Sequence, residues 1–155
     1  MASARIECYY LDTSALVKRY VNEPGSEIVD EIYTKAYRGV AVIAASYWNM
    51  AEAAVVFDKY ERRRGLSARR LLGALLRESR TLAGLLRLKL VPISPALIRE
   101  TTELVLKHHM YSADALQIAS ARYANCKYLV TADSRLAEAA ATEKLEAITV
   151  GVDEA

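Results

Sequence analysis

The stretch from Ile6 to Leu16 constrains the fold of this chain more than any other. Its apolar and aromatic residues predict a buried strand that stops at Asp12, and a helix begins directly after the hydroxyl pair Thr13 and Ser14. A strand that ends on an acid and turns straight into a helix places that acid at the carboxyl edge of a sheet. In open α/β sheets this edge is where ligands bind. Asp12 is therefore the first candidate for a functional site.

Predicted strands and helices alternate along the rest of the 155 residues. Further short apolar strands are expected at about residues 40–44, 89–93, 127–131 and 147–150. This alternation predicts βαβ units, and therefore an α/β fold with helices on both faces of a parallel sheet. Pro92 in the third strand predicts an edge position for it. No repeat or linker interrupts the pattern, so residues 1–155 are expected to form a single domain.

Serine residues mark several expected helix starts. Ser26, Ser67 and Ser112 are predicted N-caps, because a serine side chain accepts a hydrogen bond from a backbone N–H group of the first turn. The break between Gly65 and Ser67 predicts a helical hairpin over about residues 58–88, with arginines on its outer faces. The leucines of its second helix are expected to form core or a dimer surface. They are Leu71, Leu72, Leu75, Leu76, Leu82, Leu85 and Leu86.

The charge is unevenly distributed along the chain. The net charge is only +2, but the segment from Lys59 to Lys89 holds ten basic residues and two acids, so it carries +8 and the remainder −6. Such asymmetry indicates a polyanionic partner, although a solvated helical face would give the same pattern. The candidate contacts to such a polyanion in this segment are Arg62, Arg63, Arg64 and Arg69.

Cys8 and Cys126 lie far apart in the sequence and do not have the spacing of a metal-binding pair, so buried free thiols are expected. No apolar run reaches the length of a signal peptide or a membrane span, which predicts a soluble, cytoplasmic protein without a membrane partner. The chain holds one glutamine and three asparagines. Scarcity of these thermolabile amides is a weak indication of a thermophilic source.

Asp133 follows the fourth predicted strand as Asp12 follows the first, and each acid has two interpretations. An aspartate before a helix is a good N-cap, and capping would occupy the same oxygens that a ligand site needs. Two strands of one sheet that both end on aspartate, however, bring two carboxylates to the same edge. The same pattern at two strands therefore favours a ligand site over capping alone.

Glu52 and Asp114 complete the candidate set. On a helix Glu52 shares an apolar stripe with Trp48, Val55 and Val56, where an ionised carboxylate is costly unless it is paired with an arginine or binds a metal. Asp114 lies in the first turn of its predicted helix, where the helix dipole alone would favour an acid. Its position near the strand edge also suits a ligand.

Four carboxylates that converge would repel one another, and some would stay protonated at neutral pH. A hard divalent cation removes this repulsion, and Mg²⁺ or Mn²⁺ prefers such oxygen ligands. An ion of this kind suits phosphodiester hydrolysis, because it lowers the pKa of a bound water and neutralises charge on the leaving oxygen. The adjacent histidines, His108 and His109, are interpreted as a helix-end surface feature rather than a metal site.

Four motifs together resemble the PIN domain, and within it the VapC-type toxins of prokaryotic toxin–antitoxin modules. They are residues 10–14 (YLDTS), Glu52, residues 111–119 (YSADALQIA) and residues 129–136 (LVTADSRL). The resemblance covers essentially the whole chain. It implies a three-layer α/β/α sandwich with a central parallel sheet in the order 3-2-1-4-5, and an endoribonuclease that uses Mg²⁺ or Mn²⁺.

The resemblance also implies roles for individual residues. Asp12, Glu52, Asp114 and Asp133 would form the acidic metal site, and Ser14 and Thr131 would support its carboxylates or a water on the metal. Members of this family usually form homodimers, and the toxins among them are silenced by a small antitoxin protein, so both partners are expected here beside the RNA substrate.

Three other functions compete with this interpretation. A signalling receiver would need adjacent acids after the first strand, whereas Thr13 and Ser14 follow Asp12. A nuclease for structured DNA would need larger acidic sets and helical arches, for which the chain has little room. A catalytically silent RNA-binding or scaffolding protein on the same fold is the main alternative, and the intact set of four acids disfavours it.

Overall fold

The computed structural model describes residues 5–151, and within them five strands form one sheet. The strands are β1 (Glu7–Leu11), β2 (Ala41–Ser46), β3 (Leu88–Val91), β4 (Tyr128–Thr131) and β5 (Glu146–Thr149). Every pairing is parallel and the spatial order is β3-β2-β1-β4-β5. This is the order that the resemblance implied, and β3 is an edge strand, as Pro92 predicted.

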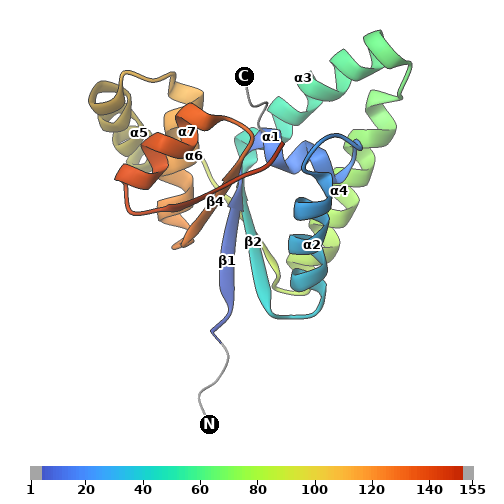
Figure 1. The fold of residues 1–155 in the computed structure, drawn as a ribbon, viewed down its shortest axis with the longest axis horizontal. Helices are drawn as coiled ribbons and strands as arrows, with labels where there is room; N and C mark the ends of the chain where they lie inside the picture. Colours follow the sequence, from blue (N-terminus) through green and yellow to red (C-terminus); the bar gives the residue numbers. More distant parts are fainter. Residues whose placement is uncertain (1–4, 152–155) are drawn as a thin grey trace.

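The helices cover both faces of the sheet and confirm the predicted three layers. They are α1 (Thr13–Leu16), the 3₁₀ turn η1 (Val17–Arg19), α2 (Ser26–Tyr37), α3 (Tyr47–Arg64), α4 (Ala68–Gly84), α5 (Pro95–His108), α6 (Ser112–Tyr123) and α7 (Ser134–Thr142). Figure 1 shows α2 and α4 on one side of the sheet and α5, α6 and α7 on the other. No helix in residues 5–151 combines the length and the apolar character needed to cross a membrane.

The alternation of side chains along β1 divides the core into two parts. Tyr9 and Leu11 belong to the apolar cluster beneath α2, α3 and α4, whereas Tyr10 belongs to the cluster beneath α5, α6 and α7. Tyr10 is completely buried, and its hydroxyl donates a hydrogen bond to Gln117 Oε1 of α6 at 2.7 Å. The central strand therefore fixes both helical layers relative to the carboxyl edge of the sheet.

Two of the three predicted serine N-caps are wrong. Ser26 and Ser112 are the first residues of α2 and α6, and the N-caps are Gly25 and Tyr111, neither of which makes a side-chain cap. Ser67 is the predicted N-cap and accepts a hydrogen bond from the backbone N–H of Arg70.

The predicted leucine stripe is only partly core. Leu75 and Leu82 are buried, but Leu76, Leu85 and Leu86 are exposed, and α4 ends at Gly84. The hairpin formed by α3 and α4 turns through residues 65–67. The exposed leucines leave open the predicted alternative of a dimer surface.

The prediction of free thiols is also wrong, because Cys8 and Cys126 form a disulfide with their Cα atoms 4.6 Å apart. The physical reason is the parallel pairing of β1 with β4, whose register sets Tyr9 opposite Tyr128. Cys8 therefore lies beside the residues that lead into β4. Separation along the sequence gave no indication of this contact.

Candidate active site

Asp12 is buried directly after β1, and both of its carboxylate oxygens accept hydrogen bonds. Oδ1 accepts from the backbone N–H of Ala15 at 2.9 Å and from Ser14 Oγ at 2.7 Å, and Oδ2 accepts from Thr131 Oγ1 at 2.5 Å. Burial raises the pKa of Asp12 to about 6; these hydrogen bonds oppose the shift, and the charge of Asp133 adds to it. Asp12 is thus both a helix cap and a carboxylate at the edge of the sheet.

Asp133 lies two residues after β4 and caps α7. Its Oδ1 accepts from the backbone N–H groups of Arg135 and Leu136, at 2.9 and 3.2 Å, and the side chain is exposed. Thr131 Oγ1 accepts from the backbone N–H of Asp133 at 2.9 Å while it donates to Asp12. One threonine hydroxyl therefore links the two acids that end β1 and β4.

Ser14 makes a second link of the same kind. Its hydroxyl donates to Asp12 Oδ1 and accepts from the backbone N–H of Ala132 at 2.9 Å. Ser14 and Thr131, the two residues expected to support the acids, both contact Asp12 and both hold the turn between β4 and α7. Their hydroxyls fix the position of the Asp12 carboxylate.

Glu52 is half-buried on α3, and the apolar stripe predicted to share its face is buried only in part, at Val56, which packs against the core. Trp48 and Val55, which share its helical face, are 46% and 57% exposed. The buried face of α3 is formed instead by Asn49, Ala53 and Phe57. Glu52 lies on the border between these faces, and no basic side chain within residues 5–151 forms an ion pair with it.

The partner of Glu52 is Thr13, whose Oγ1 donates a hydrogen bond to Glu52 Oε1 at 2.8 Å. Burial raises the pKa of Glu52, and the charge of Asp114 adds to the shift. The Thr13 contact joins α3 to the residue that follows Asp12. The sequence placed Thr13 in the opening motif but gave it no role.

Asp114 lies half-buried in the first turn of α6. Burial raises its pKa, and the charge of Asp133 raises it further. The charge of Asp133 thus raises the pKa of both Asp12 and Asp114, and the charge of Asp114 raises that of Glu52. These effects indicate that the four acids share one electrostatic environment.

All four predicted acids line one cavity of about 370 Å³, here called the acid cavity. The acids are contributed by the ends of β1 and β4, by α3 and by α6. Among residues 5–151, Lys59 is the only basic residue in the lining, and Gln117 completes the wall on α6. Neither residue was predicted as part of the site, although Gln117 is one helical turn after Asp114 and faces the same way.

The donor set of the acid cavity consists of carboxylates and hydroxyls, which is the set that a hard cation prefers. Among residues 5–151, no three His, Cys, Asp or Glu side chains are arranged to hold a metal ion directly. The arrangement fits an ion that keeps several waters between itself and the protein, as Mg²⁺ commonly does. It does not fit a closed, structural zinc site.

The four arginines predicted to contact RNA lie away from the acid cavity, at the turn of the α3–α4 hairpin. Arg62, Arg63, Arg64 and Arg69 are all exposed. Arg62 pairs with Asp58 at 3.2 Å, and the Arg64 guanidinium lies over the Tyr60 ring. Arg62 lies ten positions after Glu52 on α3, which corresponds to about 15 Å along the helix.

The chain was compared with known proteins. No curated protein sequence matches it significantly. In solved structures, it is similar to VapBC2 from Rickettsia felis bound to a fragment of promoter DNA, with a TM-score of 0.64, 19% identity, and coverage of 92% of this chain and 98% of that one.

Two further structures share the fold. VapC20 from Mycobacterium tuberculosis, a toxin that cleaves the sarcin–ricin loop, has a TM-score of 0.64 and 14% identity, covering 84% of this chain and 94% of that one. PAE2754 from Pyrobaculum aerophilum has a TM-score of 0.63 and 18% identity, covering 93% of this chain and 85% of that one. The sequence model of the PIN domain matches residues 9–142. This chain therefore belongs to the PIN domain family.

Proposed function

We propose that this chain is a divalent-metal-dependent endoribonuclease and the toxin of a toxin–antitoxin pair. The observation that carries the proposal is the acid cavity, in which carboxylates from four separate segments line one hollow at the carboxyl edge of the sheet. Membership of the PIN domain family supports it, as does the likeness to VapC20, which is itself an RNA-cleaving toxin.

Asp12, Asp114 and Asp133 would hold an Mg²⁺ or Mn²⁺ ion, and Glu52 would be a further ligand or would orient the attacking water. When bound, the ion would supply a water of lowered pKa and neutralise charge on the phosphate. Ser14 and Thr131 keep both oxygens of Asp12 in fixed directions, as partners of metal ligands commonly do.

Lys59 and the hairpin arginines would bind the RNA backbone. Lys59 is exposed on the wall of the acid cavity, where its ammonium group can attract a phosphate. Arg62, Arg63, Arg64 and Arg69 would hold more distant phosphates at the hairpin turn. An excess of positive charge in this segment would give binding that weakens as salt is added.

A homodimer and an antitoxin are the proposed protein partners. An apolar hollow of about 230 Å³, lined by Trp48, Ile93 and Ile98 among others, lies beside the acid cavity and shares Ala113 with it. Exposed apolar surface of this kind is typical of protein interfaces. An RNA-cutting toxin would act in the cytoplasm, where its substrate is found.

The test is cleavage of an end-labelled mixed RNA pool by the purified chain in Mg²⁺, Mn²⁺ or EDTA. We expect cutting with either metal and none with EDTA. Asp12→Asn should lower the rate at least about a hundredfold, because it removes a negative charge that the proposed metal site needs.

Asp58→Asn is the matched control, since Asp58 is an exposed acid on α3 outside the acid cavity. It should cut as the wild type does. Cutting that persists in EDTA, or that Asp12→Asn retains, would contradict the proposal. A folded, metal-binding chain that cuts no RNA in the pool would favour the silent RNA-binding alternative.

A further inference from the structure

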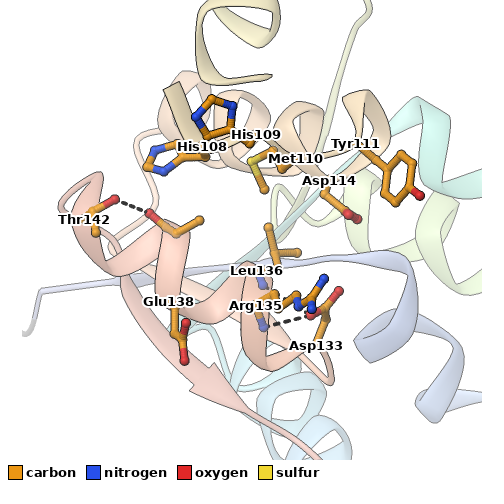
Figure 2. Close-up of a pocket in the computed structure, with 11 residues that line it drawn as sticks. His108, His109, Met110, Tyr111, Asp114, Asp133, Arg135, Leu136, Glu138 and Thr142 are labelled. Carbon is orange, nitrogen blue, oxygen red and sulfur yellow. Dashed lines mark hydrogen bonds between the residues drawn. The ribbon is translucent and has the colours of Figure 1, made fainter. Parts of the chain in front are cut away.

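A second cavity of about 570 Å³ adjoins the acid cavity and shares Asp114 and Asp133 with it. It is here called the α5–α7 cavity, because it lies between the end of α5 with the loop into α6 and the exposed face of α7 (Figure 2). Its volume is in the range of about 300–1,000 Å³ that is typical of ligand pockets.

The wall formed by the end of α5 and the loop into α6 carries three aromatic rings, of which those of His109 and Tyr111 are exposed. Figure 2 shows His108, His109 and Tyr111 on this wall, with Asp114 beside Tyr111. Tyr111 is 84% exposed, so packing in the core does not account for its ring. Exposed aromatic rings beside a nucleic-acid path are the surfaces on which unpaired bases stack.

His109 occupies a position that the backbone would favour for glycine. It caps the C-terminus of α5 with φ 52°, in the left-handed region, where glycine has the lower conformational cost. The turn therefore does not require an imidazole. His108 differs, because its Nε2 lies 2.8 Å from Oε1 of Glu143, a carboxylate that also accepts from Lys107.

The opposite wall, on α7, carries a cation. Arg135 is exposed, and its guanidinium forms no ion pair in the part of the chain that the structure describes. It lies next to Asp133, on the side of the cavity that borders the acids, while Glu138 lies farther along the same wall (Figure 2). A phosphate would therefore be attracted to the Arg135 end of the cavity.

We propose that the α5–α7 cavity holds the nucleotide next to the scissile phosphate, with its base against Tyr111 and His109 and its phosphate at Arg135. The proposal rests on the function proposed above and assigns residues that would hold one nucleotide of its substrate. A base can stack on these rings only when it is unpaired, so the nucleotide in the cavity would be unpaired.

The test measures binding of a fluorescein-labelled, eight-nucleotide single-stranded RNA by anisotropy in Mg²⁺. All proteins carry Asp12→Asn so that the probe stays intact. We expect Tyr111→Ala and His109→Gly each to weaken binding about 5- to 100-fold, the range expected for loss of one base stack. His109→Gly should unfold at the same or higher urea concentration, because glycine suits the left-handed turn.

Matched controls separate a site from a general effect. Asn125→Gly changes another exposed left-handed residue, with φ 55°, and Tyr123→Ala removes a ring that is 60% exposed at the far end of α6. Both should bind the probe as the parent does. Arg135→Gln should reduce the slope of log K against log salt by about 0.7, and Arg38→Gln, on the exposed C-cap of α2, should leave the slope unchanged.

The outcomes distinguish this proposal from the proposed nuclease. Unchanged RNA binding in Tyr111→Ala and His109→Gly would overturn the proposal even if the wild-type chain cuts RNA. The proposal would also be overturned if the controls Tyr123→Ala and Asn125→Gly lost as much affinity for RNA as these variants. A loss of RNA affinity confined to Tyr111→Ala and His109→Gly would support the cavity as an RNA site even if the wild-type chain cuts no RNA. In that case only the proposed nuclease activity would be contradicted.

Discussion

At the scale of single residues, Asp12 combines two roles with one carboxylate. Its Oδ1 caps α1 through the backbone N–H of Ala15, and its Oδ2 accepts from Thr131 on β4. The sequence left capping and ligand binding as alternatives, and the geometry allows both. The cost of this arrangement is the burial of a negative charge, which raises the pKa of Asp12 to about 6.

This cost predicts that Asp12→Asn stabilises the metal-free fold at neutral pH. A folded-state pKa near 6 against an ordinary value of 3.8 means that ionised Asp12 opposes folding as the pH rises through this window. The variant should gain about 1–2 kcal/mol in free energy of unfolding at pH 7.5, after the weakened hydrogen bonds are allowed for.

Urea unfolding in EDTA measures the difference between variant and wild type at pH 7.5 and again at about pH 4. The difference should be largest above pH 6 and much smaller near pH 4, where the carboxyl is protonated in the folded state and still partly ionised in the unfolded state. A variant that is less stable than the wild type at pH 7.5 would contradict this account of the buried charge.

The acids were predictable one by one, but their surroundings were not. Asp12 and Asp133 follow apolar strands, a local pattern that a sequence displays directly. Thr13 and Glu52, by contrast, are 39 residues apart and meet only because α3 packs beside α1. Lys59 lines the acid cavity for a similar reason, because the packing of α3 turns the face that carries Lys59 toward the cavity.

At the scale of elements, the α3–α4 hairpin is fixed to the rest of the fold by Glu78. Arg19 donates to both oxygens of this carboxylate, at 2.9 and 3.1 Å, and the hydroxyls of Tyr20 and Tyr37 donate as well. Burial alone would raise the pKa of Glu78, but these hydrogen bonds outweigh it and lower the pKa below its ordinary value.

Glu78→Gln should therefore destabilise the chain by about 1–2 kcal/mol at pH 7, a figure reduced from that of a fully buried pair because the group is partly exposed. Because the folded state lowers the pKa of Glu78, its ionisation stabilises the fold when the pH is above the unfolded-state pKa. This contribution is lost as the pH falls through the folded-state pKa. Asp58→Asn, which removes one exposed ion pair with Arg62, should change the stability by less than about 0.5 kcal/mol.

Urea unfolding at pH 7 and at about pH 3.5 checks both variants. Equal stability of Glu78→Gln and the wild type at pH 7 would mean that the carboxylate does not anchor the hairpin. A destabilisation that stays the same at both pH values would mean that packing, not ionisation, is responsible.

The helix boundaries show where local patterns stop being sufficient. Ser67 caps α4 as predicted, but α2 begins after Gly25, in the left-handed region at φ 93°. A Cβ atom at this glycine would lie 2.8 Å from the backbone nitrogen of Gly151, so a contact with the distant C-terminal segment fixes this turn. Gly25 is next to Ser26 in sequence, but its constraint comes from the other end of the chain.

At the scale of the whole molecule, the sheet order and the three layers were predictable, whereas the disulfide was not. Alternating strands and helices determine a parallel sheet, and family resemblance supplied its order. Cys8 and Cys126 are 118 residues apart, and only the pairing of β1 with β4 brings them together.

The disulfide predicts a redox-dependent stability. Closing a loop of this length should stabilise the fold by about 2–4 kcal/mol, so a reducing agent should lower the urea midpoint of the wild type. Cys126→Ser should match the reduced wild type and should not respond to the reductant. Thiol labelling of the unfolded chain that detects two free cysteines before reduction would contradict the bond.

The central claim, that four carboxylates form one divalent-metal site, is tested most directly by calorimetric titration of Mn²⁺ into the metal-free chain. We predict saturable binding to the wild type and to Asp58→Asn, and an affinity at least about tenfold lower in Asp12→Asn and in Asp133→Asn. Equal binding by all four proteins, or none by the folded wild type, would contradict the claim.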